Sequence, residues 1–224
     1  MKSKKCARCG LVNFATEEVC RRCGAPLAEI DRATYQVEGA GREGRRRSFV
    51  KRALAVLAAT GLLLLIFYIS LISTSEEVPF EQKQEVYKAI DVLDQHGFSA
   101  EAFVLRHLVN YRATDNWWNR WVGHKEAFAA TNFPFEVVTL YPEFFNDSVD
   151  DVERAAILLH ESYHLYGSGE AAALEGAWRD KSKIGWTASK YSQTKVWKST
   201  RELTMSYVPR AFQCGDDGRT DCYP

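Results

Sequence analysis

The chain has 224 residues with 29 basic and 29 acidic side chains, so its formal net charge is zero. The charges are segregated, because residues 1–52 hold 13 Lys and Arg against 6 Asp and Glu, whereas residues 53–75 hold no charge at all. This distribution excludes a single soluble domain, and an apolar content of 46% excludes a fully disordered chain. Residues 76–224 carry an acidic excess and are long enough for one folded domain.

Four cysteines lie close together near the start of the chain, at Cys6, Cys9, Cys20 and Cys23. Two Cys-x-x-Cys pairs can bring four thiolates onto one tetrahedral zinc ion, and cytosolic thiols stay reduced and available to metal. Two disulfides or an iron–sulfur site are the alternatives. A module this small has almost no core, so we expect a structural zinc ion to hold residues 1–27 folded.

The spacing of these cysteines, with Asn13 between the pairs, resembles the short zinc ribbons of the RanBP2 type. Members of that family bind single-stranded RNA or ubiquitin, which implies that Asn13, Arg21 and Arg22 make polar contacts with a partner. The family carries an aromatic residue just before the first pair, where this chain has Lys4 and Lys5. We therefore expect the ribbon to bind a cytoplasmic protein, or to be structural, rather than to bind nucleic acid.

Residues 28–52 are polar and contain several Gly and Arg, which predicts a basic, flexible linker. The uncharged stretch 53–75 follows, and it has the roughly 20 apolar residues that a transmembrane helix needs. A buried soluble helix of this length would show a polar stripe, and a cleaved signal peptide would follow a much shorter charged segment. The stretch is therefore predicted to be a retained signal anchor that crosses the membrane once.

The charges on either side of this stretch predict its orientation. Arg and Lys are concentrated at residues 42–52, whereas three glutamates follow between residues 76 and 81. Basic residues next to a span remain cytoplasmic, so we expect the N-terminus in the cytoplasm and residues 76–224 on the extracytoplasmic side.

The sequence after residue 76 predicts an α+β fold that is mainly α. Helical periodicity is expected over residues 80–95, 99–112, 147–166, 169–183 and 189–206, and a strand over residues 135–141. A loop rich in aromatic residues precedes that strand and contains Trp117, Trp118 and Trp121. These three rings either belong to the core or line a substrate pocket.

The helix expected over residues 147–166 carries His160, Glu161 and His164 in the pattern His-Glu-x-x-His. Side chains four residues apart share one face of a helix, so both imidazoles can bind one zinc ion. Glu161 lies beside the metal, where it can act as general base on a zinc-bound water. The preceding turn, Ala155–Leu159, is apolar and predicts a buried helix, in which this polar set without a metal would be costly.

This motif resembles that of the zincin metallopeptidases, which combine a strand, a helix with His-Glu-x-x-His and a third ligand further along the chain. The resemblance implies a zincin-like domain over residues 76–224 that binds one catalytic zinc ion and hydrolyses peptide bonds. It also implies that the strand, residues 137–141, pairs with a bound peptide by β-augmentation.

The resemblance also implies roles for residues that follow the motif. Glu170 has the spacing of the third ligand in the related metzincins, with Glu175 as the alternative. Residues 204–207 resemble the Met-turn and tyrosine of some metzincins, so Tyr207 would stabilise the oxyanion. His124 and Tyr191 are further candidates for that role by residue type alone.

The last two cysteines, Cys214 and Cys222, are expected to form a disulfide, because an outward-facing domain lies in an oxidising compartment. Residues 216–221 between them loosely resemble a calcium loop but lack the spacing of an EF-hand.

Two functions are consistent with these features. The first is a membrane-anchored zinc metallopeptidase, and the second is a non-enzymatic membrane scaffold or sensor with a structural metal site and a protein- or RNA-binding ribbon. Glu161 favours the first, because a structural site needs no base.

Overall fold

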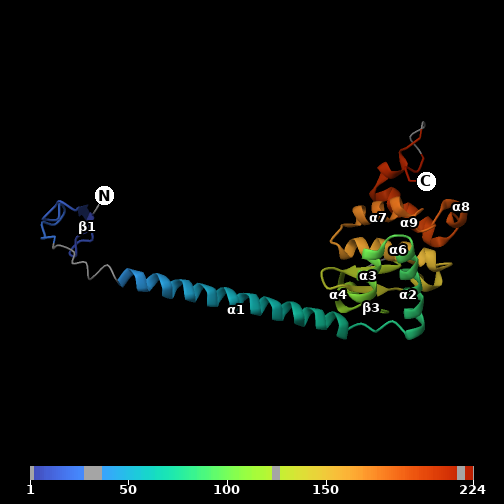
Figure 1. The fold of residues 1–224 in the computed structure, drawn as a ribbon, viewed down its shortest axis with the longest axis horizontal. Helices are drawn as coiled ribbons and strands as arrows, with labels where there is room; N and C mark the ends of the chain where they lie inside the picture. Colours follow the sequence, from blue (N-terminus) through green and yellow to red (C-terminus); the bar gives the residue numbers. More distant parts are fainter. Residues whose placement is uncertain (1–2, 28–36, 123–126, 216–219, 224) are drawn as a thin grey trace. The chain divides into compact units, whose positions relative to one another are not determined.

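The computed structural model describes residues 3–27, 37–122, 127–215 and 220–223. The chain forms two compact units, residues 1–63 and 64–224, and the long helix α1 (Val37–Ser73) contributes to both (Figure 1). Helices predominate and the two sheets are small, in agreement with the predicted α+β class.

Helix α1 is longer than the predicted span, residues 53–75. It begins at Val37, so residues 37–52 of the expected flexible linker are helical, and that expectation is wrong from Val37 on. The glycines in the segment suggested flexibility, but no proline occurs between Pro26 and Pro79, and Arg and Glu favour helix. Within α1, the segment Phe49–Ser73 is long enough and apolar enough to cross a membrane.

The first unit contains a two-stranded antiparallel sheet of β1 (Ser3–Lys5) and β2 (Val12–Phe14). Each Cys-x-x-Cys pair forms a tight turn that ends in a glycine with positive φ, which is 73° at Gly10 and 67° at Gly24. In both turns the glycine amide donates to the carbonyl of the first cysteine at 2.9 Å. The two turns are therefore equivalent, and each needs a residue that adopts this backbone conformation without strain.

The second unit consists of helices around a three-stranded sheet. Its helices are α2 (Phe80–Gln95), α3 (Ser99–His107), α4 (Trp117–Val122), α5 (Pro142–Asn146), α6 (Asp151–Leu165), α7 (Glu170–Asp180), α8 (Ala188–Tyr191), α9 (Lys195–Tyr207) and the 3₁₀ helix η2 (Pro209–Phe212). Its strands are β3 (Asn110–Arg112), β4 (Ala129–Asn132) and β5 (Val137–Leu140). Strand β5 lies in the centre of the sheet, parallel to β3 and antiparallel to β4.

Several elements differ from the prediction. Residues 110–112 were expected to end a helix but pair with β5 as β3, because pairing with a distant segment overrides weak local preference. The helix expected over residues 147–166 is present as α6 but begins four residues later, after Asp150, and the short α5 that precedes it was not predicted. Strand β4 was not predicted, since its sequence Ala-Ala-Thr-Asn is poor in strand-forming residues.

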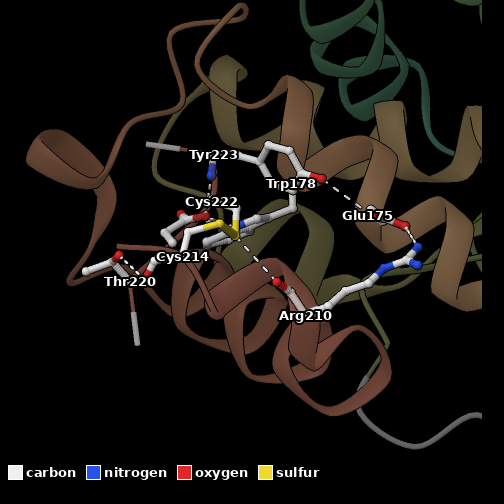
Figure 2. The surroundings of a disulfide bond; sticks show 8 residues. Glu175, Trp178, Arg210, Cys214, Thr220, Cys222 and Tyr223 are labelled. Atoms are coloured by element: carbon white, nitrogen blue, oxygen red, sulfur yellow. Dashed lines mark hydrogen bonds and ion pairs between the residues drawn. A yellow bond between two sulfur atoms is a disulfide. The ribbon is translucent and has the colours of Figure 1, made fainter. Parts of the chain in front are cut away.

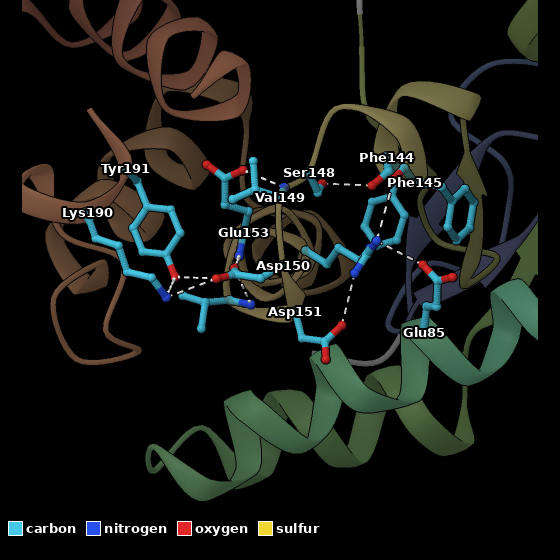
Figure 3. A network of polar contacts seen from close by, with 12 residues as sticks. Glu85, Phe144, Phe145, Ser148, Val149, Asp150, Asp151, Glu153, Lys190 and Tyr191 are labelled. Atoms are coloured by element: carbon cyan, nitrogen blue, oxygen red, sulfur yellow. Dashed lines mark hydrogen bonds and ion pairs between the residues drawn. The ribbon is translucent and has the colours of Figure 1, made fainter. Parts of the chain in front are cut away.

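Helix α6 lies in the middle of the second unit and packs against α2, α3, α5, α7 and β4. Its start is fixed by Asp150, whose carboxylate accepts hydrogen bonds from the amides of Val152 and Glu153 at 3.1 and 3.2 Å. The same carboxylate accepts a hydrogen bond from the Tyr191 hydroxyl at 2.8 Å and pairs with Lys190 at 3.0 Å (Figure 3). Burial opposes ionisation of Asp150, but these bonds hold the pKa of its carboxyl below the usual value.

Glu153, in the first turn of α6, is fully buried. Its carboxylate accepts hydrogen bonds from the amide of Val149 at 3.0 Å, the indole of Trp186 at 3.4 Å and the hydroxyl of Thr194. These bonds tie α6 to the segment that carries α8 and α9, so the buried acid organises the C-terminal helices.

The predicted disulfide between Cys214 and Cys222 is present (Figure 2). Next to it, the Asp221 carboxylate accepts a hydrogen bond from the indole of Trp178 on α7 and pairs with the buried Lys181, both at 3.0 Å. The bridge therefore closes a loop that is bound to the core. Most of the loosely calcium-like segment, residues 216–219, lies outside the described residues.

Candidate metal centres

The four N-terminal cysteines converge on one point. The sulfur atoms of Cys6 and Cys23 are 3.6 Å apart, those of Cys9 and Cys20 are 3.5 Å apart, and all four lie within 4.8 Å of one another. Tetrahedral zinc with bonds of about 2.3 Å to sulfur separates its ligands by roughly 3.8 Å. The cluster therefore has the size and donor set of a structural zinc site and can hold such an ion.

Backbone amides favour the thiolate at Cys6 and Cys20. At Cys23, by contrast, the amide of Ala25 is outweighed by burial and the neighbouring sulfur atoms, which raise the pKa of its thiol to about 12. The amide of Cys9 lowers the pKa of the Cys6 thiol. Burial opposes ionisation of Cys20, yet the amides of Arg22 and Cys23 lower its pKa to about 6. Because a metal binds the thiolate form, these amides help to prepare the site for an ion.

Asn13 does not face a partner, in contrast to the expectation from the RanBP2 resemblance. It is 5% exposed, and its amide nitrogen donates to the Leu11 carbonyl at 3.0 Å and to the Cys20 sulfur at 3.7 Å. Its side-chain oxygen accepts from the amide of Arg21 at 3.1 Å. Asn13 thus links the two cysteine turns, while the side chains of Arg21 and Arg22 remain at the surface.

A second cluster lies in the second unit, where His160 and His164 stand one turn apart on α6 and Glu170 begins α7. The two Nε2 atoms are 3.1 Å apart, and Glu170 carboxylate oxygens lie 3.5 Å from that of His160 and 3.2 Å from that of His164. Tetrahedral zinc with bonds of about 2.0–2.1 Å separates its ligand atoms by roughly 3.3 Å. These three side chains can therefore hold a metal.

A tight turn between α6 and α7 places Glu170 opposite the histidines. Gly167 has a φ of 80°, and its amide and that of Ser168 donate to the carbonyls of His164 and Tyr163 at 2.9 and 3.0 Å. The Nδ1 of His164 donates to the Ser168 carbonyl at 2.9 Å. This bond leaves the Nε2 lone pair of His164 available for a metal.

The two helices approach each other closely at Gly176 on α7. A Cβ atom at this position would lie 2.8 Å from the ring of Tyr163, a residue within the His-Glu-x-x-His motif. The Tyr163 hydroxyl donates to Asp180 at 3.0 Å, which holds the ring in place. The contact keeps α7 against α6 and so determines where Glu170 stands.

The two histidines differ in their proton affinity. Burial lowers the pKa of His160, which favours the neutral imidazole that a metal requires. Burial has the same effect on His164, but the hydrogen bond and charge of Glu170 raise its pKa to about 9. A metal that binds here at neutral pH would displace this proton.

Glu161 shares a cavity of about 810 Å³ with His160, His164 and Glu170. It is 4% exposed, and its Oε2 accepts a hydrogen bond from the Thr131 hydroxyl on β4 at 2.7 Å. Its carboxylate is not part of the cluster of three ligand atoms. Three carboxylates therefore line the cavity, namely Glu170, which can bind a metal with the histidines, Glu161, which can accept a proton beside them, and Glu202 on α9.

Strand β4, rather than β5, borders this cavity. The sequence predicted that β5 would pair with a peptide, but both edges of β5 are occupied by other strands, so that expectation is wrong. Residues 129–131 of β4 line the cavity, and within the described part of the chain β4 pairs only with β5. Thr131 was missed because nothing in the sequence places it opposite Glu161.

Of the other residues that the sequence suggested for the active site, Tyr207 alone lies at the cavity among those that the structure describes. Tyr207 lines the cavity and is 55% exposed. Tyr191 does not line it, because its hydroxyl is bonded to Asp150 at the start of α6. Glu175 pairs with Arg210 at 2.7 Å and does not join the histidines. His124 lies outside the described residues.

Comparisons with protein-family models, with curated proteins and with solved structures give no match to this chain.

The substitution Asn13→Ala should weaken metal binding by the four-cysteine cluster. It removes a donor to the Cys20 sulfur and the link between the two turns, so zinc affinity should fall by about 10-fold or more. Competition with a chelator, after Co²⁺ titration has established the tetrathiolate spectrum, measures the change. Arg22→Ala is the matched control, because this side chain is exposed. Equal affinities for Asn13→Ala and wild type would contradict the role assigned to Asn13.

The substitution Gly176→Ala should weaken metal binding at the second cluster. Its methyl group would press on the Tyr163 ring at 2.8 Å, force α7 away from α6 and displace Glu170. We expect about a 10-fold loss of zinc affinity, as is typical when support of a ligand is disturbed. Gly169→Ala is the control, since no atom lies within 4 Å of a Cβ there. If both variants bind the second zinc ion as wild type does, the close approach does not position Glu170.

Proposed function

We propose that the chain is a membrane-anchored zinc metallopeptidase whose second unit hydrolyses peptide bonds. The proposal rests mainly on one observation, the cavity that contains both the His-His-Glu cluster and the separate carboxylate of Glu161. A structural metal site gains nothing from a buried base beside its ligands, whereas hydrolysis needs one.

His160, His164 and Glu170 would hold the ion. When bound, zinc supplies a Lewis acid that polarises a carbonyl group and promotes the ionisation of water. Glu161 takes a proton from water as the water attacks the scissile carbonyl, and then transfers this proton to the leaving amine. The hydrogen bond from Thr131 to Oε2 would hold the Glu161 carboxylate in position for this proton transfer.

The substrate backbone would lie along β4, the edge strand that borders the cavity. An extended peptide can form main-chain hydrogen bonds with such an edge, and the small side chains of Ala129 and Ala130 leave room for it. Tyr207, on the same cavity, would donate a hydrogen bond to the oxyanion that develops on the attacked carbonyl.

The anchor would be the stretch Phe49–Ser73, crossing the membrane once with the first unit in the cytoplasm. Many of its apolar side chains, Leu62 and Leu63 among them, are more than half exposed, which is costly in water and favourable in a bilayer. Basic residues precede the stretch and acidic residues follow it. The disulfide of the second unit and the four free cysteines of the first are consistent with this orientation.

The first unit would bind a cytoplasmic protein. Beside its cysteine cluster it exposes Val12, Phe14 and Val19, each by more than half. A unit of this size with apolar side chains at its surface is suited to an apolar partner surface.

The substitution Glu161→Gln should abolish hydrolysis without removing the metal. Because Glu161 is not one of the ligands, zinc content should stay at the wild-type value, while activity falls by about 10²-fold or more. His164→Ala and Glu170→Ala should instead lose the second zinc ion, and Glu175→Ala should keep it as the matched control. Metal analysis and cleavage of a peptide library by the full chain measure both properties.

Two outcomes would decide against parts of this mechanism. Full activity of Glu161→Gln would mean that Glu161 is not the base. A wild-type protein that holds both zinc ions but cleaves no member of a broad peptide library would favour the non-enzymatic scaffold or sensor.

The proposed topology predicts that a reporter enzyme that is active only outside the cytoplasm gains activity when fused after Pro224, but not when fused before Met1. Replacing Arg45, Arg46 and Arg47 by Glu should reduce the activity of the C-terminal fusion, because these charges would hold the N-terminus in the cytoplasm. Activity of the N-terminal fusion alone would reverse the assignment.

A further inference from the structure

Helix α4 carries three tryptophans that do not belong to the core. Trp117, Trp118 and Trp121 are 38%, 37% and 75% exposed, and neighbouring ring centroids in this group are 5.6 and 5.2 Å apart. They do not line the cavity that contains His160, His164 and Glu170, which we call the metal cavity. The two positions that the sequence suggested for them, in the core or in a substrate pocket, are therefore both wrong. By contrast, Trp178, Trp186 and Trp197 form the buried core of the C-terminal helices. We call the three exposed residues the tryptophan patch.

Helix α4 lies beside the end of α1, so the tryptophan patch adjoins the apolar stretch of that helix (Figure 1). The rings of Trp117 and Trp118 pack edge-on against Phe67, with centroids 5.6 and 5.9 Å away. The indole of Trp117 donates to the Ser70 hydroxyl at 3.0 Å. Both partners belong to the last two turns of the stretch Phe49–Ser73, so the patch is continuous with this end of the stretch.

The end of α1 is held firmly in the second unit. Leu71 is fully buried, and the buried Arg112 on β3 donates to the Ile72 carbonyl at 2.8 Å and to the Ser75 hydroxyl at 2.9 Å. The tryptophan patch therefore keeps a constant position relative to the last turns of the apolar stretch.

We propose that the tryptophan patch docks the second unit on the outer leaflet of the membrane that α1 crosses. Phe67 precedes Ser73 by six residues, or about 9 Å of helix, which is comparable to the 5–8 Å or so of each interfacial layer of a bilayer. Tryptophan is enriched in this layer, because its ring is apolar and its N–H is polar. Arg120, exposed on the same helix, is suited to contact lipid phosphates.

Packing of the second unit against Phe67 would also bring the metal cavity to the membrane surface. Phe135, in the turn between β4 and β5, packs against Phe67 and Tyr68 with centroids 5.1 and 6.4 Å away. Two residues earlier, Phe133 is 58% exposed and lines the metal cavity. Two residues span at most about 7 Å, so the rim of the cavity lies next to residues of the span.

This position defines a substrate class, a deduction that rests on the proposed peptidase function. The cavity would receive peptide segments held close to the bilayer, such as the stretch of a membrane protein just outside its span or a peptide bound to the lipid surface. Soluble peptides would enter the same cavity but would not be concentrated at its rim.

Fluorescence of the full chain in lipid vesicles tests the docking. Phosphatidylcholine with brominated acyl chains should quench tryptophan emission relative to ordinary phosphatidylcholine, and the variant Trp117→Phe/Trp118→Phe/Trp121→Phe should lose this difference. The single variant Trp121→Phe, which alters only the most exposed ring, should lose part of it. Equal quenching of wild type and the triple variant would overturn the proposal, as would no quenching at all, the result expected for a patch covered by a partner protein.

A cleavage assay tests the substrate class with one peptide offered either free or attached to a lipid in the same vesicles. Trp121→Ser should lower the ratio of tethered to free cleavage several-fold, whereas Phe103→Ser, an exposed aromatic on α3, should leave the ratio unchanged. An unchanged ratio in Trp121→Ser would refute the substrate class. If wild type cuts neither form, the peptidase proposal and its substrate class fail together, while the quenching result still decides the docking.

Discussion

The second unit depends on one constraint, the burial of a helix that carries charged side chains. Helix α6 is covered by α2, α3, α5, α7 and β4, so its buried carboxylates need partners in neighbouring elements, whereas Nε of Arg154 and Nδ1 of His160 are buried without a hydrogen-bond partner among the described residues. Glu153 is satisfied by Trp186 and Thr194, and Glu161 by Thr131 on β4. The hydrogen bonds that offset the cost of burying these carboxylates therefore also position the surrounding helices and the edge strand.

The candidate metal site uses the same packing. Its ligand atoms come from two helices joined by a turn of four residues, and the approach of Gly176 to Tyr163 leaves α7 little freedom to move. Sites built on rigid elements hold their ligands more accurately than sites on loops. Glu161 stands on the same buried helix as His160 and His164, so distances between these three residues change little unless the helix itself deforms. In the first unit, by contrast, the four cysteines make up most of a small core, to which Leu27 and Ala25 contribute.

Local chemistry in the sequence was sufficient to predict several features. The spacing of four cysteines indicated their convergence, the uncharged run after residue 52 indicated a long apolar helix, and His160 with His164 indicated a shared face of α6. Glu170 was expected from its spacing alone and does lie opposite the two histidines. Each of these features depends on residues that are close in the chain, where backbone geometry leaves few arrangements.

Features that join distant segments were decided only by the tertiary structure. Pairing of β3 and β4 with β5 made β4 the edge strand at the cavity, although its own residues favour no strand. Asn13, expected at the surface, is buried because it completes the link between two turns. The position of Trp117 and Trp118 against Phe67 joins segments about fifty residues apart. The sequence by itself thus determined the local motifs, and packing between distant segments determined which surfaces those motifs face, because side-chain contacts across the fold leave no periodic signal in the chain.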